Sequence, residues 1–318
     1  MSESELKEII DKYKEFDDPN YRDYCENPER YYKNLKKRLG IKDRSISTDE
    51  QAVEFYNKGC AYSEENDWDN AIKSYTEAIK LDKNYGIAYC NRGVAYAKKG
   101  NLNQAIEDYT KATKLDSNDE IAYLMRGNAY SDMEDYDNAI KDYTKRIKMN
   151  KNYTHDDYMV YCNRGIAYFE KGNIDKAIKD YDKALELYSG DELTYLHRGR
   201  AYAAQENWDK AIEDYTEAIK SDPSRERQGL AIQAYSYRGY AYFQKGDWIK
   251  AIRSYTKAIN LEPDYDEAHF YRGCAYASKG DFDKAIEDFA KTVELNPNNK
   301  QAHEYLEQAK AEKRKSKK

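Results

Sequence analysis

Arginine and aspartate side chains recur at corresponding places along this sequence. The arginines are Arg92, Arg126, Arg164, Arg198, Arg238 and Arg272, and the aspartates are Asp108, Asp142, Asp180, Asp214 and Asp288. Such residues could form a strip that binds anions, or they could pair with one another. Because five of the six arginines have an aspartate in the same segment, we predict a ladder of ion pairs between packed helices. Breaking one partly buried pair should cost more than breaking a surface pair, which is worth under about 1 kcal/mol.

The residue types that most often bind metals are scattered. They are Cys25, Cys60, Cys90, Cys162 and Cys274, with His155, His197, His269 and His303. The cysteine count is odd, no CxxC occurs and no histidine has ligand spacing to a cysteine, so we predict reduced thiols and no metal site. A phosphate-binding glycine loop and a nucleophile elbow are also missing. We therefore predict no catalytic residues, no cofactor and no enzymatic activity.

Charge and hydropathy limit the classes of partner. The 318 residues have a net charge of −6, 35% of them are charged, and the mean hydropathy is −1.10. These values favour a thin, elongated core over a compact globule and predict no general attraction to nucleic acid or anionic membrane. No run is apolar enough to span a bilayer, and residues 1–16 lack the apolar core of a secretory signal. We expect a cytoplasmic protein.

One pattern of about 34 residues is repeated seven times. In the stretch Ile87–Asp116, Tyr89 and Gly93 lie on one helical stripe, Gly100 interrupts it, and a second stripe begins at Leu102. The glycine of the first helix recurs as Gly59, Gly93, Gly127, Gly165, Gly199, Gly239 and Gly273, and an alanine of the second recurs as Ala71, Ala105, Ala139, Ala177, Ala211, Ala251 and Ala285. The glycines and the alanines recur at the same intervals along the sequence, which indicates a series of helical hairpins. Each hairpin needs a neighbour to bury its apolar stripe.

This pattern resembles the tetratricopeptide repeat (TPR) family over residues 52–299. Tyrosine holds one position without exception, as Tyr62, Tyr96, Tyr130, Tyr168, Tyr202, Tyr242 and Tyr276. The departures from the family pattern are His269, Arg146 and Thr292, and the final proline survives only at Pro223, Pro263 and Pro297. The resemblance implies an all-α fold, a right-handed superhelix of helix–turn–helix repeats (an α-solenoid), and a protein that holds other proteins.

The expected organisation has three parts. An N-terminal helical extension covers residues 1–51, and a C-terminal cap helix with a basic tail covers residues 300–318. Between them, the seven repeats are expected at residues 52–85, 86–119, 120–153, 158–191, 192–225, 232–265 and 266–299. Ser47 or Thr48 is expected to cap the first repeat helix. Residues 1–46 either cap the array or occupy its groove.

Two insertions interrupt the regular spacing. They lie near residues 154–157 and 226–231, between one hairpin and the next. Both could be slack in the connecting loops or contact points for a partner, and we favour slack. We expect the second to start the following helix early.

In the TPR family the first helix of each repeat lines the concave face, which implies where a partner would bind. The groove residues implied in this way are Val53, Tyr56, Asn57, Ile87, Cys90, Asn91, Val94, Ile121, Leu124, Asn128, Met159, Cys162, Asn163, Ile166, Leu196 and Arg200. Most are apolar, and an exposed apolar strip needs a cover. We expect a protein or peptide partner with apolar anchors, either extended or helical. The alternative is that these side chains complete the packing between adjacent helices.

Two binding modes of the family can be compared with this sequence. The carboxylate clamp of heat-shock co-chaperones needs a lysine after the first aromatic position, where this chain has none, so a chaperone C-terminus is not expected. An asparagine ladder that grips peptide backbone is matched only at Asn57, Asn91 and Asn163. The leading hypothesis is a non-catalytic interaction scaffold. The alternatives are an RNA-binding helical-repeat protein and a regulatory subunit of an enzyme complex.

Overall fold

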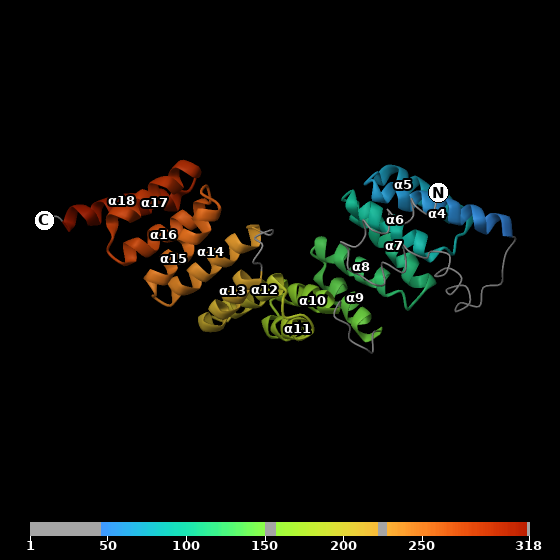
Figure 1. Cartoon of the computed structure of the whole chain (residues 1–318), viewed down its shortest axis with the longest axis horizontal. Coiled ribbons are helices and arrows are strands. Elements are labelled where there is room, and N and C mark those ends of the chain that lie inside the picture. Colours follow the sequence, from blue (N-terminus) through green and yellow to red (C-terminus); the bar gives the residue numbers. More distant parts are fainter. Residues whose placement is uncertain (1–45, 150–156, 222–227, 317–318) are drawn as a thin grey trace. The chain divides into compact units, whose positions relative to one another are not determined.

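The structure, a computed structural model, describes residues 46–149, 157–221 and 228–316, and these residues form fifteen helices (Figure 1). The chain divides into two compact units, Met1–Ala167 and Tyr168–Lys318. The predicted extension before residue 46 and the insertion near residues 154–156 lie outside the described residues.

The helices of each unit follow one another as hairpins. The N-terminal unit contains α4 (Ile46–Glu64), α5 (Trp68–Leu81), α6 (Gly86–Lys98), α7 (Leu102–Leu115), α8 (Glu120–Asp132), α9 (Tyr136–Met149) and most of α10 (Tyr158–Glu170). The C-terminal unit contains α11 (Ile174–Leu187), α12 (Glu192–Ala204), α13 (Trp208–Ser221), α14 (Gln228–Gln244), α15 (Trp248–Leu261), α16 (Asp266–Ser278), α17 (Phe282–Leu295) and α18 (Lys300–Lys315). We call the even-numbered helices α4 to α16 helix A, and the odd-numbered helices α5 to α17 helix B. The predicted all-α repeat architecture is confirmed.

The turn between helix A and helix B has a left-handed residue at one fixed position. Glycine takes it at Gly100, Gly172, Gly246 and Gly280, with φ between 76° and 82°. Asn66, Glu134 and Glu206 occupy it in the other repeats, with φ between 56° and 61°. The left-handed region disfavours residues that have a Cβ atom, so the predicted helix break at Gly100 follows from the geometry of the turn.

Helix A lies close against helix B because its landmark glycine has no side chain. A Cβ atom built on Gly93 would lie 2.7 Å from Cε1 of Tyr109, and one built on Gly59 would lie 2.5 Å from the Tyr75 ring. The same contact recurs at Gly127, Gly199, Gly239 and Gly273, each against an aromatic ring of its own helix B. The seven landmark alanines of helix B are fully buried. Glycine and alanine therefore allow the approach that buries the aromatic rings.

Three boundary predictions can be compared with the helices. Helix α4 begins at Ile46, so the predicted N-cap residues Ser47 and Thr48 lie inside its first turn, and that prediction is wrong. The early start of the helix after the second insertion is confirmed, because α14 has 17 residues where α6 has 13. The cap helix is also confirmed: Asn299 caps α18, whose Ala302 and Ala309 are buried against the last repeat.

No helix within the described parts of the chain combines the length and the apolar character needed to cross a membrane.

The glycine contact generates a stability prediction. Gly93→Ala should lower the free energy of unfolding by about 1–3 kcal/mol, because the buried Tyr109 ring cannot move away from a new methyl group. Urea denaturation followed by circular dichroism would measure the loss. Gly229→Ala in α14 is the control, since nothing lies within 4 Å of its built Cβ. Equal stabilities for the two variants would contradict the role assigned to Gly93.

Candidate partner-binding surface

The sixteen residues implied for the groove differ widely in exposure. Seven are buried: Tyr56, Ile87, Cys90, Asn91, Ile121, Cys162 and Leu196. Seven are half-buried: Val53, Val94, Leu124, Asn128, Asn163, Ile166 and Arg200. Asn57 and Met159 are exposed. The burial of these seven favours the alternative that was left open from sequence, in which the side chains complete the packing between adjacent helices, and the groove assignment stays a prediction.

Tyr56 shows why these positions are buried. Its ring centroid lies 5.8 Å from that of Tyr75 and 5.3 Å from that of Tyr85. Its hydroxyl accepts a 2.9 Å hydrogen bond from Nδ2 of Asn91, in the next helix A. In the first repeat, the position after the first aromatic therefore faces the adjacent repeat, and the Tyr56 side chain joins the core.

The asparagines of helix A also bind one another. Oδ1 of Asn128 accepts hydrogen bonds from the Tyr143 hydroxyl at 2.8 Å and from Nδ2 of Asn163 at 3.2 Å. Asn91 is only 7% exposed. Of the three asparagines that matched a backbone-gripping ladder, Asn57 alone is fully at the surface.

The N-terminal unit keeps a partly exposed apolar set on four successive helices A. We call the inner strip Val53 of α4, Val94 of α6, Leu124 of α8, and Met159 and Ile166 of α10. Met159 is 40% exposed, which is unusual for a large apolar side chain. The strip is narrower than the sixteen predicted residues, and it has at least one member in each of the first four repeats.

Arg200 belongs to the C-terminal unit and already has partners there. Its guanidinium lies 5.1 Å from the centroid of the Phe169 ring and 3.9 Å from a carboxylate oxygen of Glu170. It also lies 3.4 Å from Nδ1 of His197. Burial, followed by the charge of Arg200, lowers the pKa of His197 to about 4. The His197 ring stacks on Tyr181, with centroids 6.1 Å apart.

The predicted ion pairs are the main polar contacts between helices. Nε and Nη2 of Arg92 donate to the two carboxylate oxygens of Asp108, at 2.8 and 2.7 Å. The third nitrogen, Nη1, donates to Thr76 in the preceding helix B at 3.0 Å. We call this arrangement the arginine fork, and it joins three consecutive helices.

Four complete forks are present among the described residues, so the predicted pairing of arginine with aspartate is confirmed at those sites. They are Arg92 with Asp108, Arg126 with Asp142, Arg198 with Asp214, and Arg272 with Asp288. Burial opposes the charge on each arginine, but the hydrogen bonds and charge of the aspartate outweigh it and raise the arginine pKa. The pair of Arg164 and Asp180 involves residues of both units and stays a prediction.

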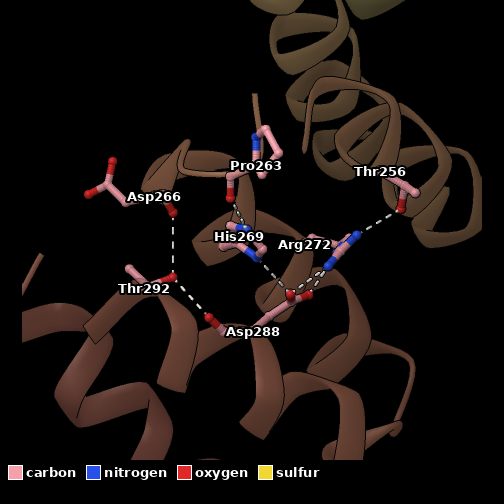
Figure 2. Close-up of polar contacts among 7 residues, drawn as sticks. All are labelled: Thr256, Pro263, Asp266, His269, Arg272, Asp288 and Thr292. Carbon is pink, nitrogen blue, oxygen red and sulfur yellow. Dashed lines mark hydrogen bonds and ion pairs between the residues drawn. The ribbon is translucent and has the colours of Figure 1, made fainter. Parts of the chain in front are cut away.

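The last fork includes a histidine (Figure 2). His269 departs from the aromatic pattern, and its Nδ1 lies 3.1 Å from Oδ1 of Asp288 while its Nε2 lies 3.0 Å from the carbonyl oxygen of Pro263. Burial favours the neutral acid, but Arg272 and then His269 outweigh it and lower the pKa of Asp288. His303 makes the same contact with the Pro297 carbonyl at 3.0 Å. A histidine at this position therefore makes a hydrogen bond to the carbonyl of a proline six residues earlier, in the turn before its helix.

A basic cavity lies between α7, α8 and α9, and the sequence analysis missed it. Its volume is about 570 Å³. It is lined by Thr110, Thr113, Lys114, Tyr123, Arg126, Lys141, Asp142, Thr144, Lys145 and Lys148. The four lysines are exposed, and the one carboxylate binds Arg126. The spacing of Lys141, Lys145 and Lys148 along one helix face was the signal that could have revealed it.

Within the described residues, no group of three or more histidine, cysteine or acidic side chains could hold a metal ion. The thiols of Cys60, Cys90 and Cys274 form no disulfide. Burial raises the pKa of Cys90 well above its usual value, so this thiol stays protonated and unreactive.

Family models match most of the repeat array. The tetratricopeptide repeat matches residues 86–119, 121–153, 158–191, 193–225 and 266–299, and a further TPR repeat model matches residues 59–100 and 239–280. The chain belongs to the tetratricopeptide repeat family, whose domains generally mediate protein–protein interactions. No catalytic domain is identified in it. No curated protein matches the sequence.

Solved structures resemble the chain in fold. The C-terminal part of a TPR repeat-containing protein from Cytophaga hutchinsonii is 20% identical, with a TM-score of 0.64 over 79% of this chain and 99% of that one. YrrB, a TPR protein with an unusual peptide-binding site, is 25% identical, with a TM-score of 0.51 over 62% and 97%. A chain of the APC/C hetero-tetramer Cut9–Hcn1 is 17% identical, with a TM-score of 0.59 over 86% of this chain, which spans about half (51%) of the length of that chain.

The arginine fork predicts an unequal cost for two matched substitutions. Asp108→Asn should lower the free energy of unfolding by about 2–3 kcal/mol, because it leaves the half-buried Arg92 charge without its carboxylate. Glu77→Gln breaks an exposed pair with Lys80 and should cost under about 1 kcal/mol. Urea denaturation at pH 7 compares the two. A loss for Asp108→Asn no larger than for Glu77→Gln would refute a structural role for the fork.

His197 predicts a pH dependence. Its pKa is about 4 when folded and about 6.5 when unfolded, so the unfolded chain takes up the proton first. The stabilisation is complete above about pH 6.5 and is lost as the pH falls through about 4. Relative to His197→Gln, the native protein should therefore lose about 1–3 kcal/mol of stability between pH 7 and pH 4. Denaturation midpoints across this range give the test, and parallel curves for the two proteins would count against it.

Proposed function

We propose that this chain is a non-catalytic interaction scaffold whose N-terminal unit binds a peptide or an extended segment of a protein partner on the inner strip. The observation that carries the proposal is the inner strip itself. Five apolar side chains stay partly exposed at predicted groove positions of four successive helices A, although seven other predicted groove residues are buried. A partner segment would remove this apolar surface from water.

The chemistry of the strip indicates the kind of ligand. Val53, Val94, Leu124 and Ile166 are aliphatic, and Met159 is flexible and adapts to varied shapes. Asn57 is exposed beside them and could bind peptide backbone. Family membership and the peptide-binding site named for YrrB support a peptide ligand over a small molecule. The proposal includes a cytoplasmic location, where the thiols of Cys60, Cys90 and Cys274 would stay reduced.

A second candidate function is RNA binding, and the basic cavity favours it. Four exposed lysines surround a hollow that contains Tyr123, and lysine with an aromatic ring is a combination that binds nucleic acid. If the native chain binds RNA tightly in a filter-binding assay at low salt, and the binding weakens steeply as salt is added, then replacing both Lys141 and Lys145 with glutamate should abolish it. If the native chain shows no such binding, RNA is excluded and the scaffold proposal stands.

The scaffold proposal predicts the effect of charges on the inner strip. Replacing both Leu124 and Ile166 with aspartate should weaken capture of the partner at least tenfold, because a buried charge opposes apolar contact. Met159→Asp, at a more exposed position, should act in the same direction with less effect on folding. Affinity capture with quantitative mass spectrometry measures the change.

Ile249→Asp is the matched control, since Ile249 is 59% exposed and lies on a helix B. It should leave the captured proteins unchanged. Circular dichroism confirms that each variant is folded. Unchanged capture by the folded Leu124 and Ile166 double variant, and by Met159→Asp, would remove the inner strip as the binding surface.

A further inference from the structure

One arginine lacks the carboxylate that completes the fork. In the four complete forks, Nε and Nη2 hold an aspartate, and Nη1 holds an oxygen of the preceding helix B; Figure 2 shows the fork of Arg272. Arg238 makes only the contact of Nη1 with the preceding helix B. Its Nη1 donates to Thr216 at 3.2 Å, while its Nε is buried and has no hydrogen-bond partner.

The cause lies in helix α15. Where the other forks have aspartate, this repeat has Ser254, which is 2% exposed. Serine has a neutral hydroxyl where aspartate has a carboxylate, so it is shorter and carries no negative charge. The first repeat also has serine there, as Ser74, but its partner position holds Lys58, which is exposed and binds Glu54 at 2.7 Å. Arg238 is thus the fork arginine whose own repeat has serine at the aspartate position.

The guanidinium is nevertheless held in place. It lies 5.2 Å from the centroid of the Tyr235 ring, and the Thr216 contact fixes one nitrogen. A cation that is already oriented loses little freedom when it binds an anion. Burial lowers the pKa of Arg238, the opposite direction from the arginines of the four complete forks. The pKa difference agrees with a buried charge that lacks a counter-ion.

The surrounding charges favour an anion. Helix α15 contains no acidic residue, and its Arg253 and Lys257 are exposed. On α13, Asp214 binds Arg198 and Glu217 binds Lys220. Among the described residues, no carboxylate lies within ion-pair distance of Arg238, and leaving a half-buried charge in this state is costly.

We propose that Arg238 is a binding site for a carboxylate group, supplied from outside this chain and received by Nε and Nη2 above Ser254. The four complete forks define the ligand, because each holds a carboxylate on those two nitrogens. A carboxylate carries the two oxygens that serine lacks, and formate is the smallest carboxylate. The end of a partner's acidic side chain has the same chemistry. The site lies in the C-terminal unit and does not depend on the inner strip.

The test uses the full chain and sodium formate as the probe, with sodium chloride at equal ionic strength as the control. The Nε–H resonance of Arg238, assigned with Arg238→Gln, should shift with a saturable dependence on formate. Ser254→Asp supplies an internal carboxylate, so it should raise the melting temperature and weaken formate binding at least tenfold. A short peptide rich in glutamate is the second probe: saturation by the peptide assigns the source to a partner, and saturation by formate alone assigns it to a small acid.

Three outcomes would overturn the proposal. The Arg238 resonance could fail to saturate with either carboxylate probe. Ser254→Asp could fold normally and bind formate as tightly as the native chain. Inorganic phosphate could saturate the resonance while neither carboxylate does, which would assign the site to a tetrahedral anion instead. If Ser254→Asp does not fold, the melting temperatures of the native chain and of Arg238→Gln are compared with and without formate. Formate should raise only the native value, and an equal rise in Arg238→Gln would contradict the proposal.

Discussion

The contact of a glycine in helix A with an aromatic ring in helix B is the constraint on which the rest of each repeat depends. It brings the two helix axes close enough to enclose a tyrosine or phenylalanine ring, and it sets their register. The register then places other residues. Arg92 precedes Gly93, and Asp108 precedes Tyr109. The same helix packing that brings Gly93 into contact with the Tyr109 ring therefore also places Arg92 beside the carboxylate of Asp108. One geometric requirement therefore produces both the apolar core and the polar ladder.

Departures from the repeat pattern are explained by what each side chain contacts. His269 replaces an aromatic residue, yet it fills the space and adds hydrogen bonds to Asp288 and to the carbonyl of Pro263. Arg146 stands where the family has a small residue, and it is buried between Glu120 and Asp157, at 3.1 Å from each. Such substitutions keep the hairpin and change the polar groups within it. They make successive repeats chemically distinct while their backbones stay alike.

Much of the fold could be predicted from sequence, because helix spacing, turn glycines and paired arginines are local or periodic signals. The candidate site could be predicted only in part. Position within helix A does not reveal burial: Cys90 and Leu124 share one slot, yet Cys90 is enclosed by its neighbours and Leu124 is not. Exposure depends on which side chains of the adjacent helices contact a residue, and its position in the repeat does not determine that. The basic cavity needs three helices together, so a scan along helix A missed it.

The third nitrogen of each arginine fork has a consequence for how the array opens. Because Nη1 binds the preceding helix B, a hairpin that detaches takes away a hydrogen-bond acceptor that the next helix A was using. Nearest-neighbour terms of this kind penalise every boundary between ordered and disordered repeats. When the array unfolds from one end, several hairpins should therefore unfold together. Amide hydrogen exchange along each unit would consequently occur in blocks larger than one repeat.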